Sequence, residues 1–572
     1  MSNAKQHLPP CCHSVKIEKK DTPKARFKTE LDQFVVASKK EAFSRLASAL
    51  TDARTALKLD RLASDMRSPN GESSFKSMAD IEGYVQAVHQ YVTLVKGFTV
   101  PPSELATPIV DPAVDARGLP STPSATLQQP LIEPAPAAVS SAELPDLKQS
   151  RSKCLRFCNW RDVLTNSNAY AMNARIEMAQ ALLASGLLLR NEARVLADGI
   201  LSTWPADIRE DDLKIAYQLL LHAAGVFEAC LLALDITPEV IEGNWTDLSK
   251  KPALANGAVR AESLDEDTLM EKWREEQRRA AAGAQAASRT STGREATGST
   301  DDDFAMLKRI PDLANGRFPQ VMAWVALVEA QELVILRGVS REFVDYSLMA
   351  KLSNDNALRF RQSHSFAARH LPCSTSAVAD KLRQYCMFKD AYYAALSCYF
   401  QGAAGMERGD ARNCAKAIAN FRKATTLIRH ATQRKTAYDA TLSKDEKDRQ
   451  FVFKTVFMRS EQIIKRDLDI MTRRNDSVFY ERIPEPDAAC EPVSLVKAVE
   501  FPGLDIHPLW RDPDVAMCLY AQDRRAMAAT AGSAAPPSTN RAPATPTTTA
   551  GNTQEEQSKP RKQGCCESCA IM

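Results

Sequence analysis

The sequence predicts an all-α protein on three observations. Apolar residues recur at spacings of three and four along most of the chain, which is the helical period. No run shows the alternation of apolar and polar residues that is typical of a half-buried strand. Small residues interrupted by aromatic ones between residues 377 and 428 indicate two helices that pack closely.

Four segments predict particular helices. Residues 319–336 begin at Pro319, which suits a first helical turn, and Gly338 follows the last apolar residue, where a helix can stop. Residues 377–404 follow a Ser/Thr cluster suited to capping, and with residues 415–428 they predict a hairpin like a tetratricopeptide repeat. Residues 213–231 carry one apolar stripe, formed by Leu213, Ala216, Tyr217, Leu220, Ala224, Phe227 and Leu231.

Composition favours a soluble intracellular protein with a sizeable core. Of the 572 residues 44% are hydrophobic, and the 74 Lys and Arg nearly balance the 71 Asp and Glu. This balance argues against a nucleic-acid-binding protein, which would show a concentrated basic excess. The 14 cysteines lack the regular spacing of a disulfide framework, and we see neither a signal peptide nor a transmembrane run.

Three polar stretches divide the chain. They cover residues 101–148, about 278–303 and about 528–563, and they carry too few large apolar side chains to offset the entropy of ordering. We therefore expect a disordered N-terminus at 1–24, one domain at 25–525 with the first two stretches as disordered insertions, a linker tail at 526–568, and a separate motif at 569–572.

Motifs that carry chemistry are missing from the sequence. We find no HExxH, GxSxG, GxxxxGK[ST] or GxGxxG in a suitable context, and the eight histidines are dispersed. We therefore expect no catalytic residue, no metal and no cofactor. Cys566 and Cys569 form a CxxC whose metal or redox reading stays open, although it lacks an evident second ligand pair or basic setting. An enzyme without a recognisable motif also stays open.

An ordered set of segments resembles the Bro-one domain of ALIX-type proteins. The segments are EGYVQAVHQYVTLVKGF (82–98, fainter), RFCNWRD (156–162), DDLKIAYQLLLHAAGVFE (211–228), AWVALVEAQELVIL (323–336), SLMAKLS (347–353), KDAYYAALSCYFQGAA (389–404), AKAIANFRKATTLI (415–428), NDSVFYERIP (475–484) and SLVKAVEF (494–501). Ala184 and Tyr480 depart from the residues common in the family, and the 278–300 insertion lengthens a loop. Within the family, the chain is most similar to a member that ends in a CaaX box and lacks the V-shaped helical domain.

The resemblance implies an elongated, curved helical domain with a tetratricopeptide-like middle. It also implies a partner, the C-terminal amphipathic helix of an ESCRT-III subunit of the Snf-seven or charged multivesicular body type, bound in an apolar groove rimmed by charge. By alignment, the groove positions are the apolar Leu348, Leu352 and Val334 and the basic Lys214 and Arg337. The competing interpretation of the three apolar residues is that they are buried in the core. The competing interpretation of the two basic residues is that they lie on an ordinary solvated helix face.

The C-terminal sequence predicts a lipid anchor. Cys569 begins CAIM, which fits C-a-a-X, and a terminal Met favours farnesyl, added by a prenyltransferase. One lipid gives only marginal membrane binding, so Cys565 and Cys566 are candidate S-palmitoylation sites for a second signal. We therefore expect a peripheral protein on an endosomal or other cytosol-facing membrane.

Three alternatives stay open at this stage. A prenylated helical scaffold could bind peptides unrelated to ESCRT-III, with the Pro-rich stretches as ligands for other domains. The chain could be a structural protein of a local membrane skeleton. A deep pocket with convergent polar groups would instead favour an enzyme.

Overall fold

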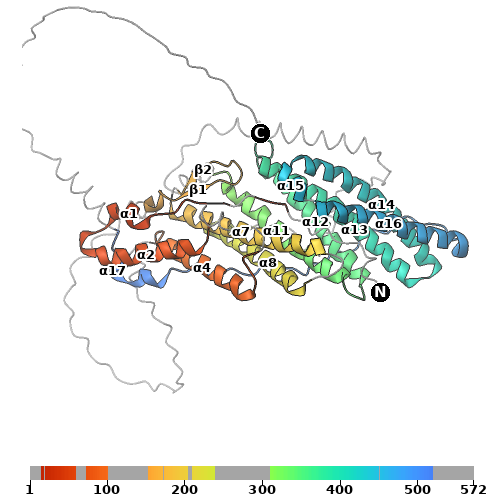
Figure 1. Cartoon of the computed structure of the whole chain (residues 1–572), viewed down its shortest axis with the longest axis horizontal. Coiled ribbons are helices and arrows are strands. Elements are labelled where there is room, and N and C mark those ends of the chain that lie inside the picture. Colours follow the sequence, from red (N-terminus) through yellow and green to blue (C-terminus); the bar gives the residue numbers. More distant parts are fainter. Residues whose placement is uncertain are drawn as a thin grey trace, which may run out of the picture. The chain divides into compact units, whose positions relative to one another are not determined.

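The computed structural model describes residues 15–17, 20–59, 73–100, 153–171, 173–203, 209–238, 310–449 and 451–519. All of them belong to the first of two compact units, residues 1–523, and the second unit, residues 524–572, lies outside the described residues. Regular structure in the described part is almost entirely helical (Figure 1). This confirms the predicted all-α class.

The helices vary from one turn to more than eight. In chain order they are α1 (Phe27–Leu31), α2 (Lys40–Ala56), α4 (Met78–Lys96), α7 (Ala174–Thr203), α8 (Glu210–Ala233), α11 (Arg317–Val339), α12 (Tyr346–His370), α13 (Ala377–Arg408), α14 (Ala411–Ala440), α15 (Lys444–Arg449), α16 (Phe451–Arg474) and α17 (Pro513–Ala516). Short 3-10 turns lie at Asp32–Phe34, Ala37–Lys39, Lys153–Leu155, Ala314–Gly316 and Pro508–Arg511, and a π turn lies at Asn475–Phe479.

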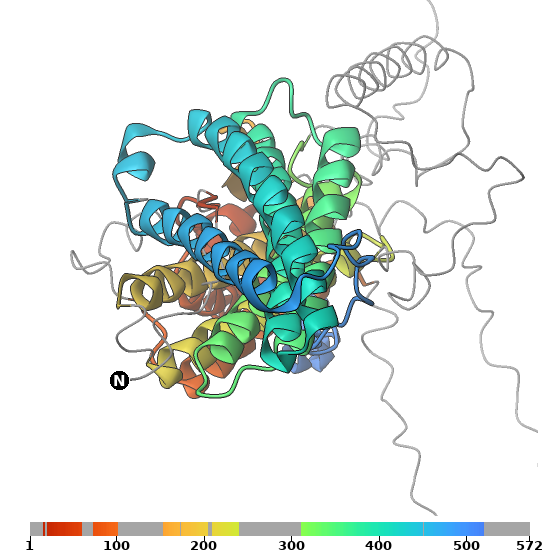
Figure 2. The same ribbon diagram turned by 90° about the vertical axis from the view of Figure 1, so that its right-hand side faces the viewer.

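Consecutive helices pack against one another through most of the unit. The tetratricopeptide-like middle is the run α12, α13 and α14, and α16 packs on α14 (Figure 2). Helices α7, α8 and α11 form the layer next to it, and α1, α2 and α17 lie at the far end of the unit (Figure 1). Side-chain caps set helix starts, since Ser376 accepts from the Ala379 N–H and Asp410 from the Asn413 N–H.

The predicted helices are present with longer bounds. Residues 213–231 and 319–336 fall inside α8 and α11, and the predicted hairpin is α13 with α14. Helix α8 is long and apolar enough to cross a membrane, but 72% of its most apolar window is buried inside the unit. Packing against α7 and α11 therefore accounts for its apolar character.

One small sheet was not expected. Strands β1 (Asn159–Arg161) and β2 (Asn168–Tyr170) pair antiparallel, with Trp160 opposite Ala169. Trp160 is fully buried, and the Asp162 carboxylate accepts the Leu164 and Thr165 N–H groups, at 3.0 and 2.8 Å, in the connecting loop. Strands of three residues are too short to show a period in the sequence.

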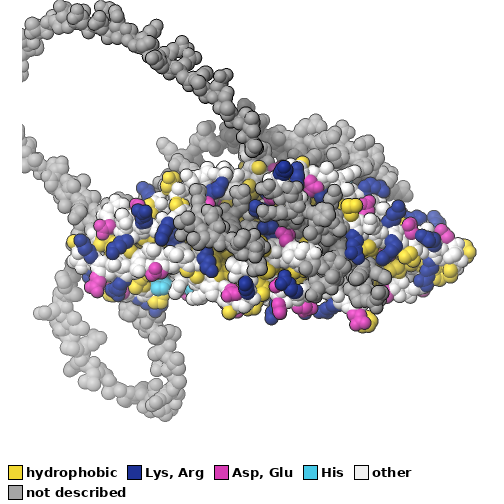
Figure 3. Space-filling view, in the orientation of Figure 1, with side chains coloured by type: hydrophobic (Ala, Val, Ile, Leu, Met, Phe, Trp, Pro, Cys, Tyr) yellow, Lys and Arg dark blue, Asp and Glu magenta, His cyan; other side chains and the backbone are white. Residues whose placement is uncertain are grey.

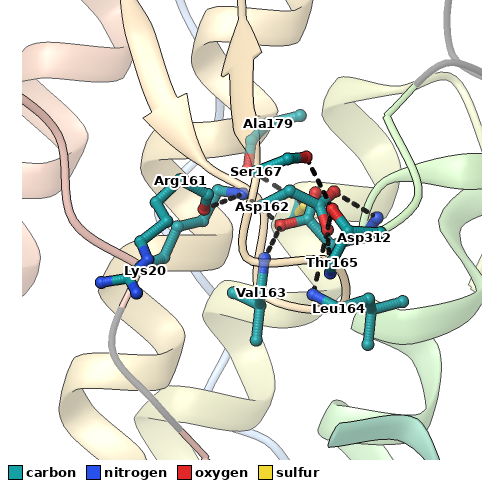
Figure 4. Close-up of polar contacts among 10 residues, drawn as sticks. Lys20, Arg161, Asp162, Val163, Leu164, Thr165, Ser167, Ala179 and Asp312 are labelled. Atoms are coloured by element: carbon teal, nitrogen blue, oxygen red, sulfur yellow. Dashed lines mark hydrogen bonds and ion pairs between the residues drawn. The ribbon is translucent and has the colours of Figure 1, made fainter. Parts of the chain in front are cut away.

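The first residues correct the predicted domain start. Residues 1–24 were expected to be disordered, yet Val15 and Ile17 are buried, and their carbonyls accept from the Arg190 and Asn191 side chains, at 3.0 Å each. Lys20 forms a fully buried ion pair with Asp312 of a segment almost 300 residues later (Figure 4). The ordered unit therefore begins by residue 15, because side chains distant in the sequence bind the backbone carbonyls and the Lys20 ammonium of this segment.

Asp312 is the centre of the contacts drawn in Figure 4. Besides Lys20, its carboxylate accepts the Val163 N–H at 2.9 Å, and its own N–H donates to Asp162 at 3.0 Å. Burial raises the pKa of the Asp312 carboxyl to about 6, and the Lys20 ammonium opposes that rise. One cation thus makes a buried carboxylate tolerable where the N-terminal segment, the β1–β2 loop and the start of the α11 region meet.

We expect Lys20→Met to destabilise the unit by about 3–5 kcal/mol at pH 7.5, since it leaves Asp312 buried without a cation. The deficit should shrink toward pH 5. Without Lys20 the pKa of Asp312 rises further, and below that pKa the folded state keeps a proton that the unfolded state releases, so stability is lost as the pH rises. Chemical denaturation at both pH values measures this, with the exposed Lys16→Met as control. Equal, small effects of the two substitutions would contradict the role of Lys20.

Candidate functional site

A groove opens between three helices on the surface of the described part of the unit. It encloses about 530 Å³. Its lining comes from the start of α8, the second half of α11 and the turn after it, the start of α12 and one later residue: Glu210, Asp211, Leu213, Lys214, Tyr217, Gln218, Leu333, Val334, Arg337, Gly338, Arg341, Leu348, Met349, Leu352 and Leu495. All five predicted partner-binding residues, far apart in sequence, therefore meet in one place.

Helix α11 forms the floor of the groove. Val334 is half-buried there, and Gly338 lies one turn later. A Cβ at Gly338 would lie only 2.6 Å from Sδ and 2.7 Å from Cε of Met349, so the missing side chain leaves room for Met349. Since a thioether side chain is unbranched and adaptable, this part of the floor can adjust to what lies on it.

Helix α12 forms one wall, and it corrects one predicted contact. The Asp345 carboxylate accepts the Leu348 N–H at 2.9 Å and starts the helix, which leaves the Leu348 side chain half-buried at the groove. Leu352 is 0% exposed, so it supports the groove from below as a core residue. Leu348 and Leu352 share one face of α12, but neighbouring residues of the unit cover only Leu352 completely.

Helix α8 forms the opposite wall, with a polar upper edge. Lys214 is exposed, and Tyr217 and Gln218 are half-buried one turn further. Burial raises the pKa of the Tyr217 hydroxyl, so this group stays protonated and is available as a hydrogen-bond donor. The wall thus combines a cation with an aromatic surface.

Charges of both signs surround the groove. Arg337 pairs with Glu210 across the helices at 2.9 Å, with 53% and 69% of the two side chains exposed, so the pair contributes little to stability. Lys214 and Arg341 are exposed and form no ion pair with another described residue. Lys and Arg also alternate with Asp and Glu over the face of the unit drawn in Figure 3. Lys214 and Arg341 are therefore available to an acidic ligand directly, and Arg337 becomes available when a carboxylate of the ligand replaces Glu210.

A late segment without helix or strand completes the groove. We call residues 480–507 the strap. Its Leu495 is 51% exposed at the groove, and the Leu495 N–H donates to Oε1 of Gln331 at 3.1 Å. Further along, the Val499 N–H donates to the Leu221 carbonyl of α8 at 3.2 Å. The strap thus crosses α11 and α8, and these two hydrogen bonds determine where Leu495 lies.

The groove has further contributors that sequence reasoning did not assign to it, among them Glu210, Tyr217, Arg341, Met349 and Leu495. Tyr217 was assigned to the apolar stripe of α8, which is correct but incomplete, because the stripe is wider than the surface that α7 and α11 cover. Leu495 lies in SLVKAVEF, a segment that the resemblance included without a role. The sequence did hold a signal for Glu210 and Arg341, because they place opposite charges at the start of α8 and just after the end of α11.

The other predicted sites differ in what the structure says of them. Cys565, Cys566 and Cys569 lie outside the described residues. Among residues that are described, no group of three or more His, Cys, Asp or Glu is arranged to hold a metal ion. Burial raises the pKa of the Cys230 and Cys386 thiols, which makes them poor nucleophiles.

The fold and the groove together define a helical domain with a charge-rimmed cleft. Residues 284–515, about two-fifths of the chain, match the family model of the BRO1-like domain. The matched range contains the floor (α11) and one wall (α12) of the groove together with the strap, and the other wall, α8, precedes it.

Two solved structures are similar at low sequence identity. One is a complex of the ALIX BRO1 domain with CHMP4C: the identity is 14%, the match covers 87% of this chain and 97% of that chain, and the TM-score is 0.45. The other is a Bro1 domain studied for endosomal targeting, with 14% identity, 89% and 98% coverage and a TM-score of 0.47. Both likenesses are too distant to carry an argument. No curated protein matches this chain.

The contact between the strap and α8 gives a stability prediction. A Cβ at Gly225 would overlap the Val499 carbonyl oxygen, which is backbone and has no flexible end to move. We expect Gly225→Ala to destabilise the unit by about 1–3 kcal/mol, as overpacking does. Gly83→Ala in α4 is the matched control, because nothing lies within 4 Å of its Cβ. That change should stabilise the unit by about 0.5–1 kcal/mol through helix propensity. Urea denaturation compares the two, and a stabilising Gly225→Ala would show that the strap does not pack on α8.

Proposed function

We propose that this chain is an adaptor whose groove binds the C-terminal amphipathic helix of an ESCRT-III subunit, in membrane remodelling or endosomal sorting. The observation that carries the proposal is the groove, where Leu348, Val334, Lys214 and Arg337 meet as the family resemblance implies. The BRO1-like match over residues 284–515 supports it. A protein-binding role, without catalysis, follows from this reading.

The dimensions of the groove suit a short helix. The α11 residues that line the groove, from Leu333 to Gly338, cover roughly 8 Å of that helix, and Arg341 extends the lining past the helix end. A partner helix with apolar residues at i, i+3 or i+4, and i+7 would bury them between Leu348, Tyr217 and Leu495. Carboxylates beside that stripe would meet Lys214 and Arg341. The absence of an aromatic at Val334 reduces the apolar area available and favours moderate affinity.

The membrane anchor is the second part of the proposal. Cys569 would carry a farnesyl group and become the last residue after removal of Ala570 to Met572, and Cys565 or Cys566 would be acylated. The low-complexity sequence before them suits a long flexible tether. In this arrangement the chain resembles BROX, a Bro-one domain protein with a CaaX box. The protein would act on a cytosol-facing membrane.

A second candidate function is a prenylated scaffold for other peptides. The mixed charge of the rim favours it, since Glu210 and Asp211 would attract a basic helix as Lys214 and Arg341 attract an acidic one. Competition between acidic and basic amphipathic peptides on the same protein separates the two functions.

Leu348→Asp should abolish binding of an ESCRT-III C-terminal helix peptide to the purified chain. A carboxylate at a half-buried position between apolar walls loses solvation when a partner covers it, and a loss of at least about tenfold in affinity follows. Fluorescence anisotropy of the labelled peptide measures it.

The matched control is Leu232→Asp. Leu232 is 55% exposed near the end of α8, roughly 27 Å along the helix from Lys214, so this change should leave both binding and folding intact. Absence of binding by the unmodified chain at high micromolar peptide would remove the ESCRT-III assignment. Unfolding of Leu348→Asp alone would mark that residue as core.

Mass spectrometry of the C-terminal peptide from the native source should show a farnesyl group on Cys569 and loss of the three residues after it. Cys569→Ser should abolish both changes and shift the protein from membranes to the soluble fraction, because the remaining acyl sites need prior membrane contact. Cys154→Ser, a buried cysteine of the described unit, controls for thiol loss in general. An unmodified end at Met572 would exclude the anchor.

A further inference from the structure

An acidic amphipathic stretch lies in the sequence between α8 and α11. Residues 262–276 read ESLDEDTLMEKWREE, and they lie outside the described residues and before the BRO1-like match begins at residue 284. Ser263 and Glu266 have the spacing of a capping box, which predicts a helix from Leu264 onward. Leu269, Met270 and Trp273 would then share one face. We infer that this stretch is an intramolecular ligand of the groove.

Charge is the first argument for this occupant. Glu262, Asp265, Glu266 and Asp267 precede the apolar stripe, so the start of the predicted helix is strongly acidic. The groove offers Lys214 and Arg341, which form no ion pair with another described residue, and Arg337, held only by an exposed pair with Glu210. Bringing these acids to the Arg337 and Arg341 end pairs the cations and replaces a weak surface ion pair with several contacts.

Size is the second argument. From Leu264 to Trp273 a helix rises roughly 14 Å, which covers the roughly 8 Å of α11 between Leu333 and Gly338 and the charged rim beyond it. Leu269, Met270 and Trp273 would lie against Leu348, Val334 and the adaptable Met349. A cleft of about 530 Å³ is of the size that accepts a few large side chains. The exposed half of Leu495 would be covered at the same time.

The chain is long enough to reach. Leu264 follows Pro238, the last described residue after α8, by 26 positions, and Ile310 follows Glu276 by 34 positions. The groove lies at the start of α8, roughly 35 Å along that helix from its end. A 26-residue connection spans up to about 85 Å when extended and roughly 28 Å as a flexible coil, so both arms reach the groove without strain.

Tethering makes this occupant a competitor. A segment held by connections of this length has an effective concentration in the millimolar range. An external helix that uses the groove must therefore displace it, and its apparent affinity falls by the fraction of chains whose groove is occupied. The inference rests on the proposed function in one respect, which is that the groove must accept an amphipathic helix.

The test uses the full chain and a fluorescent peptide of residues 261–280 as probe. In the Trp273→Asp chain, whose own segment no longer fits an apolar groove, we expect the probe to bind at least about tenfold more tightly than to the unmodified chain. Adding Leu348→Asp to that variant should abolish probe binding. The matched control is Leu254→Asp in the same connection but outside the predicted helix, which should leave the affinity unchanged.

Equal probe affinity for the unmodified and Trp273→Asp chains, or no probe binding to the variant, would overturn the inference. An ESCRT-III helix peptide run in parallel separates this failure from failure of the proposed function. If only the ESCRT-III peptide binds through Leu348, the inference fails and the proposed partner stands. If only the 261–280 probe binds through Leu348, the inference stands and the proposed ESCRT-III partner fails. Concentration-dependent self-association that Trp273→Asp removes would mean that a second copy supplies the segment, which overturns the intramolecular assignment.

Discussion

Two buried carboxylates on one turn of α11 are the constraint on which the rest of the unit depends. Glu329 accepts two hydrogen bonds from the Arg190 guanidinium of α7, at 2.9 and 2.6 Å, and one from Tyr385 of α13 at 2.9 Å. Glu332 accepts from Lys389 of α13 at 2.7 and 2.9 Å. Burial raises the pKa of Glu332 to about 8, and the Lys389 ammonium opposes the rise. Removal of Arg190 or Lys389 would leave an unpaired carboxylate in the core, so these contacts fix the rotation and height of α11 between its neighbours.

A fixed α11 is what makes a groove of defined shape. Val334 and Gly338 lie on the same helix a few residues after Glu332, on a different face, and Arg341 follows just after the helix ends, so the buried pairs also set their positions. The charges of the rim behave in the opposite way. Arg337 and Glu210 are both more than half exposed, and water can replace either partner at little cost. The unit therefore uses buried charge to hold its helices and exposed charge to meet other molecules.

What the sequence could predict depended on how local each signal was. The bounds of α8 and α11 follow from a repeating apolar stripe, and the five groove positions followed from alignment of such helices. Leu352 was misplaced because a stripe shows that a face is apolar, whereas only the packed structure shows which part of it a neighbour covers. The buried start of the chain was missed because Lys20 is polar in every local window, and its partner Asp312 lies almost 300 residues away.

The strap shows a further limit of sequence reasoning, and it also bears on specificity. Leu495 enters the groove only because the Gln331 amide and the Leu221 carbonyl hold a segment without regular structure in place. The groove therefore has a rim of mixed sign on rigid helices and an apolar edge on an irregular segment. Net charge alone gives little discrimination at such a rim, since Glu210 and Asp211 oppose Lys214 and Arg341. For the helix that we propose as the ligand, selection would come from the order of its acidic and apolar residues, because each wrong placement leaves a charge unpaired against the apolar walls.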